Sequence, residues 1–216
     1  GNINDFDPAQ NAVDYANLSD LDKSVLHKLQ TVKKQITQAF ENYEFYKYYQ
    51  ILQNFVAVDL SSLYFDIVKD TLYTAGTDSQ KRRAVQTTLY ILLQDIVRML
   101  VPVTPHQAED IWQNIPEYQQ GDIESALLTS WPEVKEDYIN EELSAKWKRI
   151  LEVRDIITKA IEPVRIQKVI GSSLETKVVL YTETDELKTL LESVKDDLGS
   201  IFITSQVEIS EEKITE

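Results

Sequence analysis

The chain has 216 residues and a mass of 24.9 kDa, with 43% hydrophobic and 27% charged residues and only five glycines and six prolines. This composition is that of a globular protein, and it excludes collagenous and largely disordered chains. The absence of cysteine excludes disulfides, thiolate catalysis and zinc sites with sulfur ligands, and the net charge of −14 argues against a broad basic surface for nucleic acid.

The first half of the chain predicts long helices. Residues 1–17 are polar, turn-rich and without a hydrophobic period, which predicts a lead-in linker. Apolar positions over residues 18–40 recur about every 3.7 residues, which predicts a helix with Ser19 as its N-cap. A second run of the same spacing predicts a long helix over residues 45–73, which the turn-forming residues 75–79 end.

Pro102 and Pro105 mark the end of one predicted helix and the start of the next. A third helix with Val85, Leu92 and Leu100 on its apolar side ends before Pro102, and Thr104 and Pro105 predict the cap and first turn of a short fourth helix. Residues 116–140 are acidic and aperiodic, which predicts a long surface connection. A fifth helix is predicted over residues 141–168, kinked or locally opened by Pro163.

The pattern changes after Gly171. Residues 174–181 and 201–209 predict two strands, separated by a helix that Gly199 would cap. We therefore expect a mainly α fold. A helical bundle would extend over residues 18–168, and a small C-terminal α/β appendage with strand-helix-strand order would follow over residues 169–216.

The sequence predicts no active site. His27 and His106 have no spacing typical of a metal site, and five scattered glycines form neither a phosphate-binding loop nor a dinucleotide fingerprint. The acid pairs Asp66/Asp70 and Glu109/Asp110 are more often solvated or paired than catalytic. No apolar run approaches the roughly 20 residues of a bilayer span. The start of the chain lacks a secretory signal, so we expect a cytoplasmic protein without a membrane partner.

Three stretches, residues 64–73, 82–87 and 101–112, resemble the anticodon-binding helical bundle of class I aminoacyl-tRNA synthetases, which the isoleucyl, valyl and leucyl enzymes share. The C-terminal part resembles the bacterial isoleucyl branch in particular. The residues that carry this likeness are Trp147, Arg154, Lys159, Ala160, Glu162, Arg165, Lys168 and residues 170–175. Residues 165–175 distinguish this branch from the valyl one, and residues 1–8 and 21–23 also fit it.

This resemblance implies binding to the anticodon region of isoleucine tRNA, in support of ATP-dependent aminoacylation by a catalytic domain of the same polypeptide. The family's His-x-Gly-His and Lys-Met-Ser-Lys-Ser signatures are missing, as is a cysteine-bound zinc module. The resemblance thus implies ATP and zinc for the parent enzyme, and neither for this chain, which we expect to be an excised monomeric C-terminal region. The alternatives are a non-enzymatic helical module that binds a protein partner and the same region of a valyl enzyme.

The candidate RNA contacts lie in locally basic regions, since residues 146–177 hold 8 basic and 4 acidic side chains. An unpaired anticodon loop is bound by stacking and by hydrogen bonds to base edges. The candidates are Lys69, Arg82, Arg83, Arg154, Arg165 and Lys168. Each has a structural alternative. Arg82 and Arg83 could pair with Asp78 or a neighbouring helix, Lys69 could neutralise Asp66 and Asp70, and Arg154 and Arg165 could pair with Asp59 or Asp66.

Tyrosines near the start of the second predicted helix form a further candidate. Tyr43, Tyr46, Tyr48 and Tyr49 surround that start. Most of these rings are expected to pack in the core, and one exposed ring could stack on a base.

Overall fold

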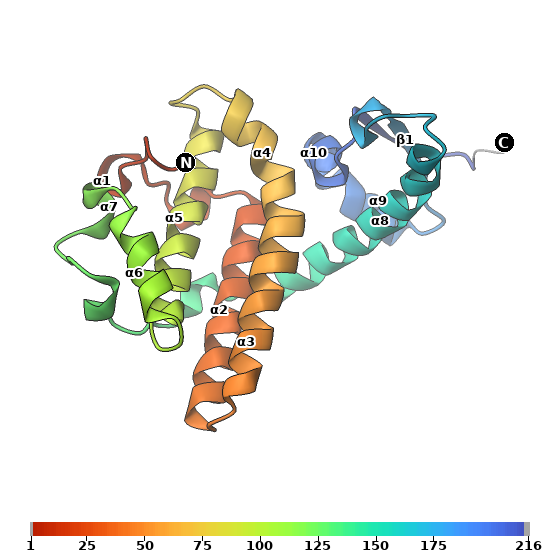
Figure 1. Cartoon of the computed structure of the whole chain (residues 1–216). Coiled ribbons are helices and arrows are strands. Elements are labelled where there is room, and N and C mark those ends of the chain that lie inside the picture. Colours follow the sequence, from red (N-terminus) through yellow and green to blue (C-terminus); the bar gives the residue numbers. More distant parts are fainter. Residues whose placement is uncertain (1, 214–216) are drawn as a thin grey trace. The chain divides into compact units, whose positions relative to one another are not determined.

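The computed structural model describes residues 2–213, which are mainly α-helical with one two-stranded sheet (Figure 1). The described chain forms two compact units. The first runs to Tyr64 and continues from Val68 to Asn140, and the second combines Phe65–Ile67 with the chain from Glu141 onward. The predicted fold class, a helical bundle followed by a small strand-helix-strand region, is confirmed.

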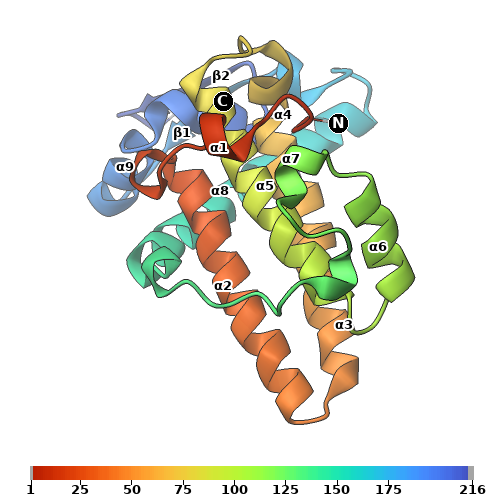
Figure 2. The same cartoon turned by 90° about the vertical axis from the view of Figure 1, so that its left-hand side faces the viewer.

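The first unit is built from helices that follow the apolar periodicity of the sequence. They are α1 (Pro8–Asn11), α2 (Asp20–Glu41), α3 (Phe45–Asn54), α5 (Gln80–Leu100), α6 (Pro105–Gln113) and α7 (Glu117–Gln120), with the short 3-10 segments η1 (Tyr15–Asn17), η3 (Ala126–Leu128) and η4 (Glu136–Tyr138). A π-helix, η2 (Phe55–Tyr64), joins α3 to α4 (Phe65–Thr74). Helix α2 packs against α3 and α5, and α5 packs against α6 (Figure 2).

Side chains on the facing sides of these helices form one hydrophobic core. Its most deeply buried members are Leu26, Leu29, Ile36, Phe55, Leu60, Tyr64, Leu92 and Met99. The predicted N-cap Ser19 is confirmed, because its hydroxyl accepts a hydrogen bond from the Asp22 N–H at 3.1 Å. Thr104 makes no such cap. Its hydroxyl instead donates to the Leu100 carbonyl at 3.4 Å.

The lead-in segment packs on this core, although its composition predicted a linker. Phe6 is fully buried, with its ring centre 5.9 Å from that of Tyr90 on α5. Burial of one such ring contributes about 2–3 kcal/mol. The Val13 N–H donates to the Thr87 hydroxyl at 3.0 Å, and the Gln119 side chain donates to the Phe6 carbonyl at 2.7 Å. A single buried ring in a polar segment carries no period, which is why the pattern missed this packing.

The predicted helix over residues 45–73 is confirmed as one continuous helix, Phe45–Thr74. The prediction that no apolar run approaches a bilayer span requires a correction, because this helix is long and apolar enough, by length and composition alone, to cross a membrane. Leu52, Phe55, Leu60 and Tyr64 on it pack into the core of the first unit. A core helix of a globular bundle has the same composition, so the criterion alone establishes no membrane span.

The acidic connection over residues 116–140 is anchored at several points. The Trp112 indole N–H donates to the Ile123 carbonyl at 3.0 Å. The Glu109 carboxylate accepts hydrogen bonds from the Ser125 hydroxyl at 2.7 Å and the Ala126 N–H at 2.9 Å. These bonds, with that of Ser125 the largest contribution, lower the pKa of Glu109. This acidic side chain therefore holds the connection to α6.

The second unit contains one long helix and a small α/β region. Its elements are α8 (Glu141–Ile166), η5 (Ser173–Glu175), β1 (Lys177–Tyr181), α9 (Asp185–Glu192), η6 (Lys195–Asp197), α10 (Leu198–Phe202) and β2 (Gln206–Ser210). Strands β1 and β2 are parallel, with Lys177 opposite Gln206. Helix α8 packs against α9 and α10, whereas the sequence grouped this helix with the bundle over residues 18–168. Pro163 lies inside α8.

The predicted second strand begins later than expected. Residues Leu198, Ile201 and Phe202 are buried on α10, and the strand starts only at Gln206. Their spacing of three and one is helical, so the apolar run that predicted a strand forms the buried side of a short helix. Gly199 lies within α10 and does not cap α9, which ends at Glu192. The left-handed turn falls at Ile203 with φ of 56°.

Candidate nucleic-acid interface

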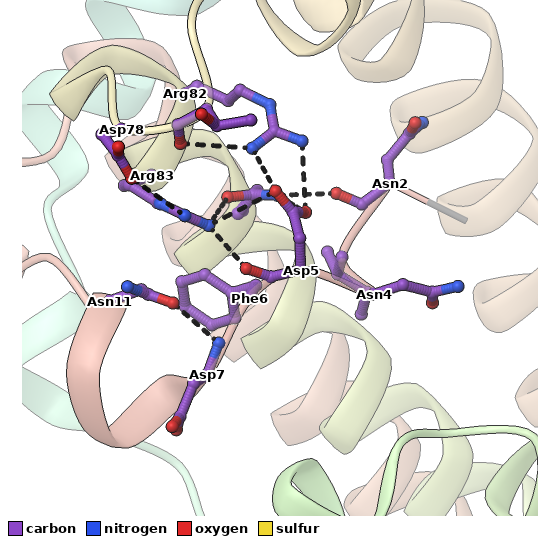
Figure 3. A network of polar contacts seen from close by, with 12 residues as sticks. Asn2, Asn4, Asp5, Phe6, Asp7, Asn11, Asp78, Arg82 and Arg83 are labelled. Atoms are coloured by element: carbon purple, nitrogen blue, oxygen red, sulfur yellow. Dashed lines mark hydrogen bonds and ion pairs between the residues drawn. The ribbon is translucent and has the colours of Figure 1, made fainter.

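Arg82 and Arg83, two of the predicted RNA contacts, lie in the first turn of α5 and bind the N-terminal segment (Figure 3). The Arg82 guanidinium donates to both carboxylate oxygens of Asp5, at 2.7 and 3.1 Å, and its Nε donates to the Leu72 carbonyl at 3.3 Å. A bidentate pair of this kind is the strongest arrangement that arginine makes with a carboxylate. Only 12% of the Arg82 side chain is exposed.

Arg83 completes the same network. Its Nη1 donates to the Asp5 carbonyl at 2.8 Å and to the Gln86 side chain at 2.9 Å, and its Nη2 lies 3.5 Å from the Asp78 carboxylate. The sequence alternative of a salt bridge to Asp78 is thus present. Hydrogen bonding to Arg82, together with Gln86, lowers the pKa of Asp5 to about 2. The two arginines hold the lead-in segment against α5, which explains cations at a helix N-terminus, where the helix dipole disfavours them.

Arg154, on α8, is also bound to protein atoms. Its Nε donates to the Ile201 carbonyl at 2.9 Å, and its Nη2 lies 3.7 Å from the Asp66 carboxylate. With 16% of its side chain exposed, this arginine ties α8 to α10 inside the second unit. Pairing with Asp66, one of the two carboxylates that the sequence offered as a structural partner, is confirmed. Lys69 is half-buried on α4.

Arg165 and Lys168 differ from these residues because they face solvent. Arg165 lies in the last turn of α8, with 56% of its side chain exposed and the neighbouring Glu162 in ion-pair range at 3.1 Å. Lys168 follows the helix in the left-handed region, with φ of 57°. The Val169 N–H closes this turn on the Val164 carbonyl at 3.1 Å. Every residue from Pro163 to Val169 is exposed, and Lys159, one turn earlier, is exposed too.

Five of the six predicted residues, all except the half-buried Lys69, therefore divide into two sets. Arg82, Arg83 and Arg154 are held by internal carboxylates and carbonyls, whereas Arg165 and Lys168 present their charges on one exposed segment of the second unit. An exposed ion pair such as that of Arg165 with Glu162 is weak, so its cation can bind a phosphate at little cost, whereas partly buried ion pairs are costly to break. The end of α8 and the turn after it, residues 159–169, thus form an exposed segment that carries Lys159, Arg165 and Lys168.

One buried cation was missed by the sequence analysis. Lys33 on α2 is 1% exposed, and its ammonium group donates to the Asp95 carboxylate and to the Glu133 carbonyl, both at 2.7 Å. It joins α2, α5 and the acidic connection. Its position four residues after Leu29 and three before Ile36 places it on the buried side of the helix, and this spacing was the available signal.

Among the residues that the structure describes, no group of three or more His, Cys, Asp or Glu side chains could hold a metal ion. His27 is buried, and its Nδ1 accepts the Asn140 N–H at 3.0 Å, which gives it a structural role. The groups of the candidate interface that face solvent are the Arg165 guanidinium and the ammonium groups of Lys159 and Lys168.

The chain is similar to isoleucine–tRNA ligases of several bacteria. It is 44% identical over its whole length to that of Natranaerobius thermophilus, 39% identical over 98% of its length to that of Caldicellulosiruptor bescii, and 40% identical over 97% of its length to that of Bacillus cereus. It spans less than a quarter of these relatives, 22–23% of their length.

Residues 22–180 match the family described as the anticodon-binding domain of tRNA ligase. This match covers most of the first unit and, in the second, α8 and most of β1. It includes all six of the predicted RNA contacts. The chain belongs to the family of anticodon-binding domains of tRNA ligases.

Proposed function

We propose that this chain binds the anticodon region of isoleucine tRNA. The match of residues 22–180 to the anticodon-binding family carries the proposal, and the names of the relatives supply the amino acid. In this proposal the attachment of isoleucine to the tRNA, driven by ATP, takes place in a catalytic domain elsewhere in a longer polypeptide. The role of this chain is to make that reaction depend on the anticodon.

The RNA contacts proposed here are electrostatic and lie on the second unit. Arg165 and Lys168 would contact backbone phosphates, and the exposed Lys159 extends the same segment. Exposed Ile166 and Val169 alternate with these cations and offer apolar surface for unstacked bases. Arg154 would act by holding the second unit together around this segment, and Arg82 and Arg83 by holding the lead-in segment on the first unit. The half-buried Lys69 stays a predicted contact.

The proposal also concerns two cofactors of the longer polypeptide, ATP and zinc. ATP follows from the proposed ligase reaction. Zinc stays a prediction drawn from the resemblance, and the residues of this chain do not fit it, because the sequence has no cysteine and its described part has no candidate metal cluster. A cytoplasmic location and a monomeric state likewise stay predictions. A protein-binding helical module and a valyl-type region are not favoured by the family match and the relatives.

A fluorescence-anisotropy titration tests the proposal. The labelled RNAs are an isoleucine tRNA transcript and the same transcript with its anticodon replaced. We expect at least ~tenfold weaker binding of the replaced transcript, which corresponds to about 1.4 kcal/mol. Two phosphate contacts predict that the affinity falls about sevenfold between roughly 50 and 200 mM salt. Equal affinity for both transcripts would contradict anticodon recognition, and no salt dependence would contradict the phosphate contacts.

A further inference from the structure

Arg98, in the last turn of α5, differs from the other arginines of the described chain. Five of the six arginines have a carboxylate oxygen within 3.7 Å, namely Arg82, Arg83, Arg149, Arg154 and Arg165. Arg98 makes no ion pair with any residue that the structure describes, and its Nε is buried there without an acceptor. The residue as a whole is half-buried. This side chain therefore holds a charge and a hydrogen-bond donor that the described fold leaves unused.

The polar residues next to Arg98 on α5 are bound to other atoms. Asp95 stands three residues earlier, at the spacing of a helical ion pair, but its carboxylate binds the ammonium group of Lys33 at 2.7 Å. Gln94, four residues earlier, donates to the Gln119 carbonyl at 3.0 Å. The carboxylate best placed along the helix to pair with Arg98 is thus committed to a buried lysine.

The helix dipole explains only part of this arrangement. A cation in the last turn of a helix interacts favourably with the carbonyl groups there, and Arg98 is the basic residue in the last turn of α5. However, a buried donor without an acceptor costs more free energy than such an interaction typically contributes. A buried water could accept from Nε, but it would leave the charge without a counterion. An anion from outside the described chain would satisfy both the donor and the charge.

The surroundings of Arg98 suit a phosphate group. Burial raises the pKa of Tyr90, two turns earlier on α5, and the positive charge of Arg98 opposes this rise. The charge is therefore felt over two helical turns. Residues 99–107, which follow Arg98, include no aspartate or glutamate, and Pro102, Val103 and residues 105–107 are exposed. A guanidinium group presents paired N–H donors that match the oxygens of a phosphate, and partial burial strengthens their attraction.

The tyrosines around the start of α3 offer no comparable cation. The sequence predicted that most of these rings would pack in the core, but of the four only Tyr48 is buried, and Tyr43, Tyr46 and Tyr49 are exposed. The cation beside them, Lys47, pairs with Glu44 at 2.7 Å. Surfaces that bind single-stranded RNA combine rings with cations that contact the phosphates. These tyrosines therefore lack the kind of free charge that Arg98 carries.

We propose that Arg98 binds a backbone phosphate of the RNA, so that the first unit also contributes a contact. The proposal rests on the proposed function for the source of the phosphate, and it adds a site to those on residues 159–169. Arg98 was not among the six residues predicted from the sequence, because a single cation within an amphipathic helix has no distinctive pattern. Its unpaired state is visible only in the folded chain.

Arg98→Gln tests this contact in the anisotropy titration with the isoleucine tRNA transcript. We expect about fivefold weaker binding, and a plot of log affinity against log salt whose slope becomes shallower by about 0.7–0.9, the value for one phosphate. The melting temperature without RNA should not fall, because no internal partner is lost. Arg149→Gln is the matched control, since it removes the same charge from an arginine that pairs with Glu186, and it should change the affinity less than ~twofold. A lower melting temperature with unchanged RNA affinity in Arg98→Gln would overturn the proposal.

The transcript with the replaced anticodon separates this proposal from the proposed function. Its phosphates are those of the original transcript, so Arg98→Gln should weaken the binding of both RNAs by the same factor. Discrimination between the two transcripts without any effect of Arg98→Gln would overturn the phosphate contact and leave anticodon recognition intact. An equal loss in Arg98→Gln for two transcripts that the parent chain binds equally would support the contact and contradict anticodon recognition.

Inorganic phosphate is the probe for a site that takes a small anion instead. At constant ionic strength it should change the melting temperatures of the parent chain and of Arg98→Gln alike, because we expect the site to take a phosphate held in the RNA backbone. A rise in the parent chain alone, together with equal RNA affinities of the two proteins, would show a site for a free anion and would overturn the proposal.

Discussion

Three cations of the first unit and two of the second have different environments. In the first unit Lys33, Arg82 and Arg83 bind carboxylates and carbonyls of the same unit, and their side chains are 1%, 12% and 13% exposed. In the second unit Arg165 is 56% exposed and Lys168 faces solvent beside it. The comparison teaches that a basic stretch of sequence indicates a candidate binding surface only where its charges are exposed, and Arg154 and Arg165 show that both kinds occur along one helix.

The comparison can be tested most severely at Lys33. Lys33→Met removes the partner of Asp95 and leaves that carboxylate and the Glu133 carbonyl without their buried donor. Removing one partner of a buried pair costs about 3–5 kcal/mol, and we expect this loss in the free energy of unfolding measured with urea. The exposed Lys34→Met, whose partner Glu136 is 73% exposed, is the control and should cost less than about 1 kcal/mol. Similar losses for both variants would show that burial does not distinguish the two cations.

The network at Asp5 predicts a smaller effect that depends on pH. The pKa of the folded Asp5 lies at about 2, below the ordinary value of 3.8, because Arg82 binds its charged form. A depressed pKa gives stability that is complete above pH 4 or so and is lost as the pH falls toward 2. Because the Asp5 side chain is 43% exposed, we expect about 1 kcal/mol after solvent screening.

Asp5→Asn measures this contribution. The variant should be less stable than the parent chain by about 1 kcal/mol at pH 7, and the two unfolding free energies should converge near pH 2. Asp7→Asn, which removes a carboxylate from the cap of α1 in the same segment, is the control for the loss of one negative charge. A constant difference between Asp5→Asn and the parent across that interval would refute the assignment.

Substitution of the exposed cations Arg165 and Lys168 should weaken RNA binding and leave the stability of the fold unchanged. Arg165→Gln with Lys168→Gln should weaken binding of the isoleucine tRNA transcript about fivefold, or about 1 kcal/mol, and should reduce its salt dependence. The melting temperature should stay the same. Lys195→Gln, an exposed cation in the same unit, provides the control with one charge removed. Weaker binding in the Lys195 variant alone would place the RNA elsewhere on this unit.

The sequence predicted the long helices well because each buries one continuous apolar stripe. Ser19 as a cap and the helix over residues 45–73 follow from local chemistry alone. The π-helix η2 was not predictable in this way, since the spacing of Phe55, Leu60 and Tyr64 departs only slightly from an α-helix. The elements of the C-terminal appendage were more difficult to predict, because the short apolar run that contains Ile201 and Phe202 suits a strand or a helix equally.

The candidate site was predictable as a set of residue types but not as a set of free charges. Whether Arg82 is available depends on Asp5, which lies 77 residues away and joins it only through the folded lead-in segment. Arg154 likewise depends on the Ile201 carbonyl, a backbone atom without any sequence signature. Partners of this kind are fixed by the tertiary packing, so periodicity and local charge could not reveal them.

The π-helix η2 also constrains how the chain can vary in length. Deleting one residue between Phe55 and Tyr64, if the segment keeps its winding, would rotate everything beyond the deletion by about a quarter of a turn relative to what precedes it. The Tyr64 hydroxyl, which donates to the buried Asp22 carboxylate at 2.5 Å, would then point away from its acceptor. We therefore expect homologues to keep the length of these ten residues.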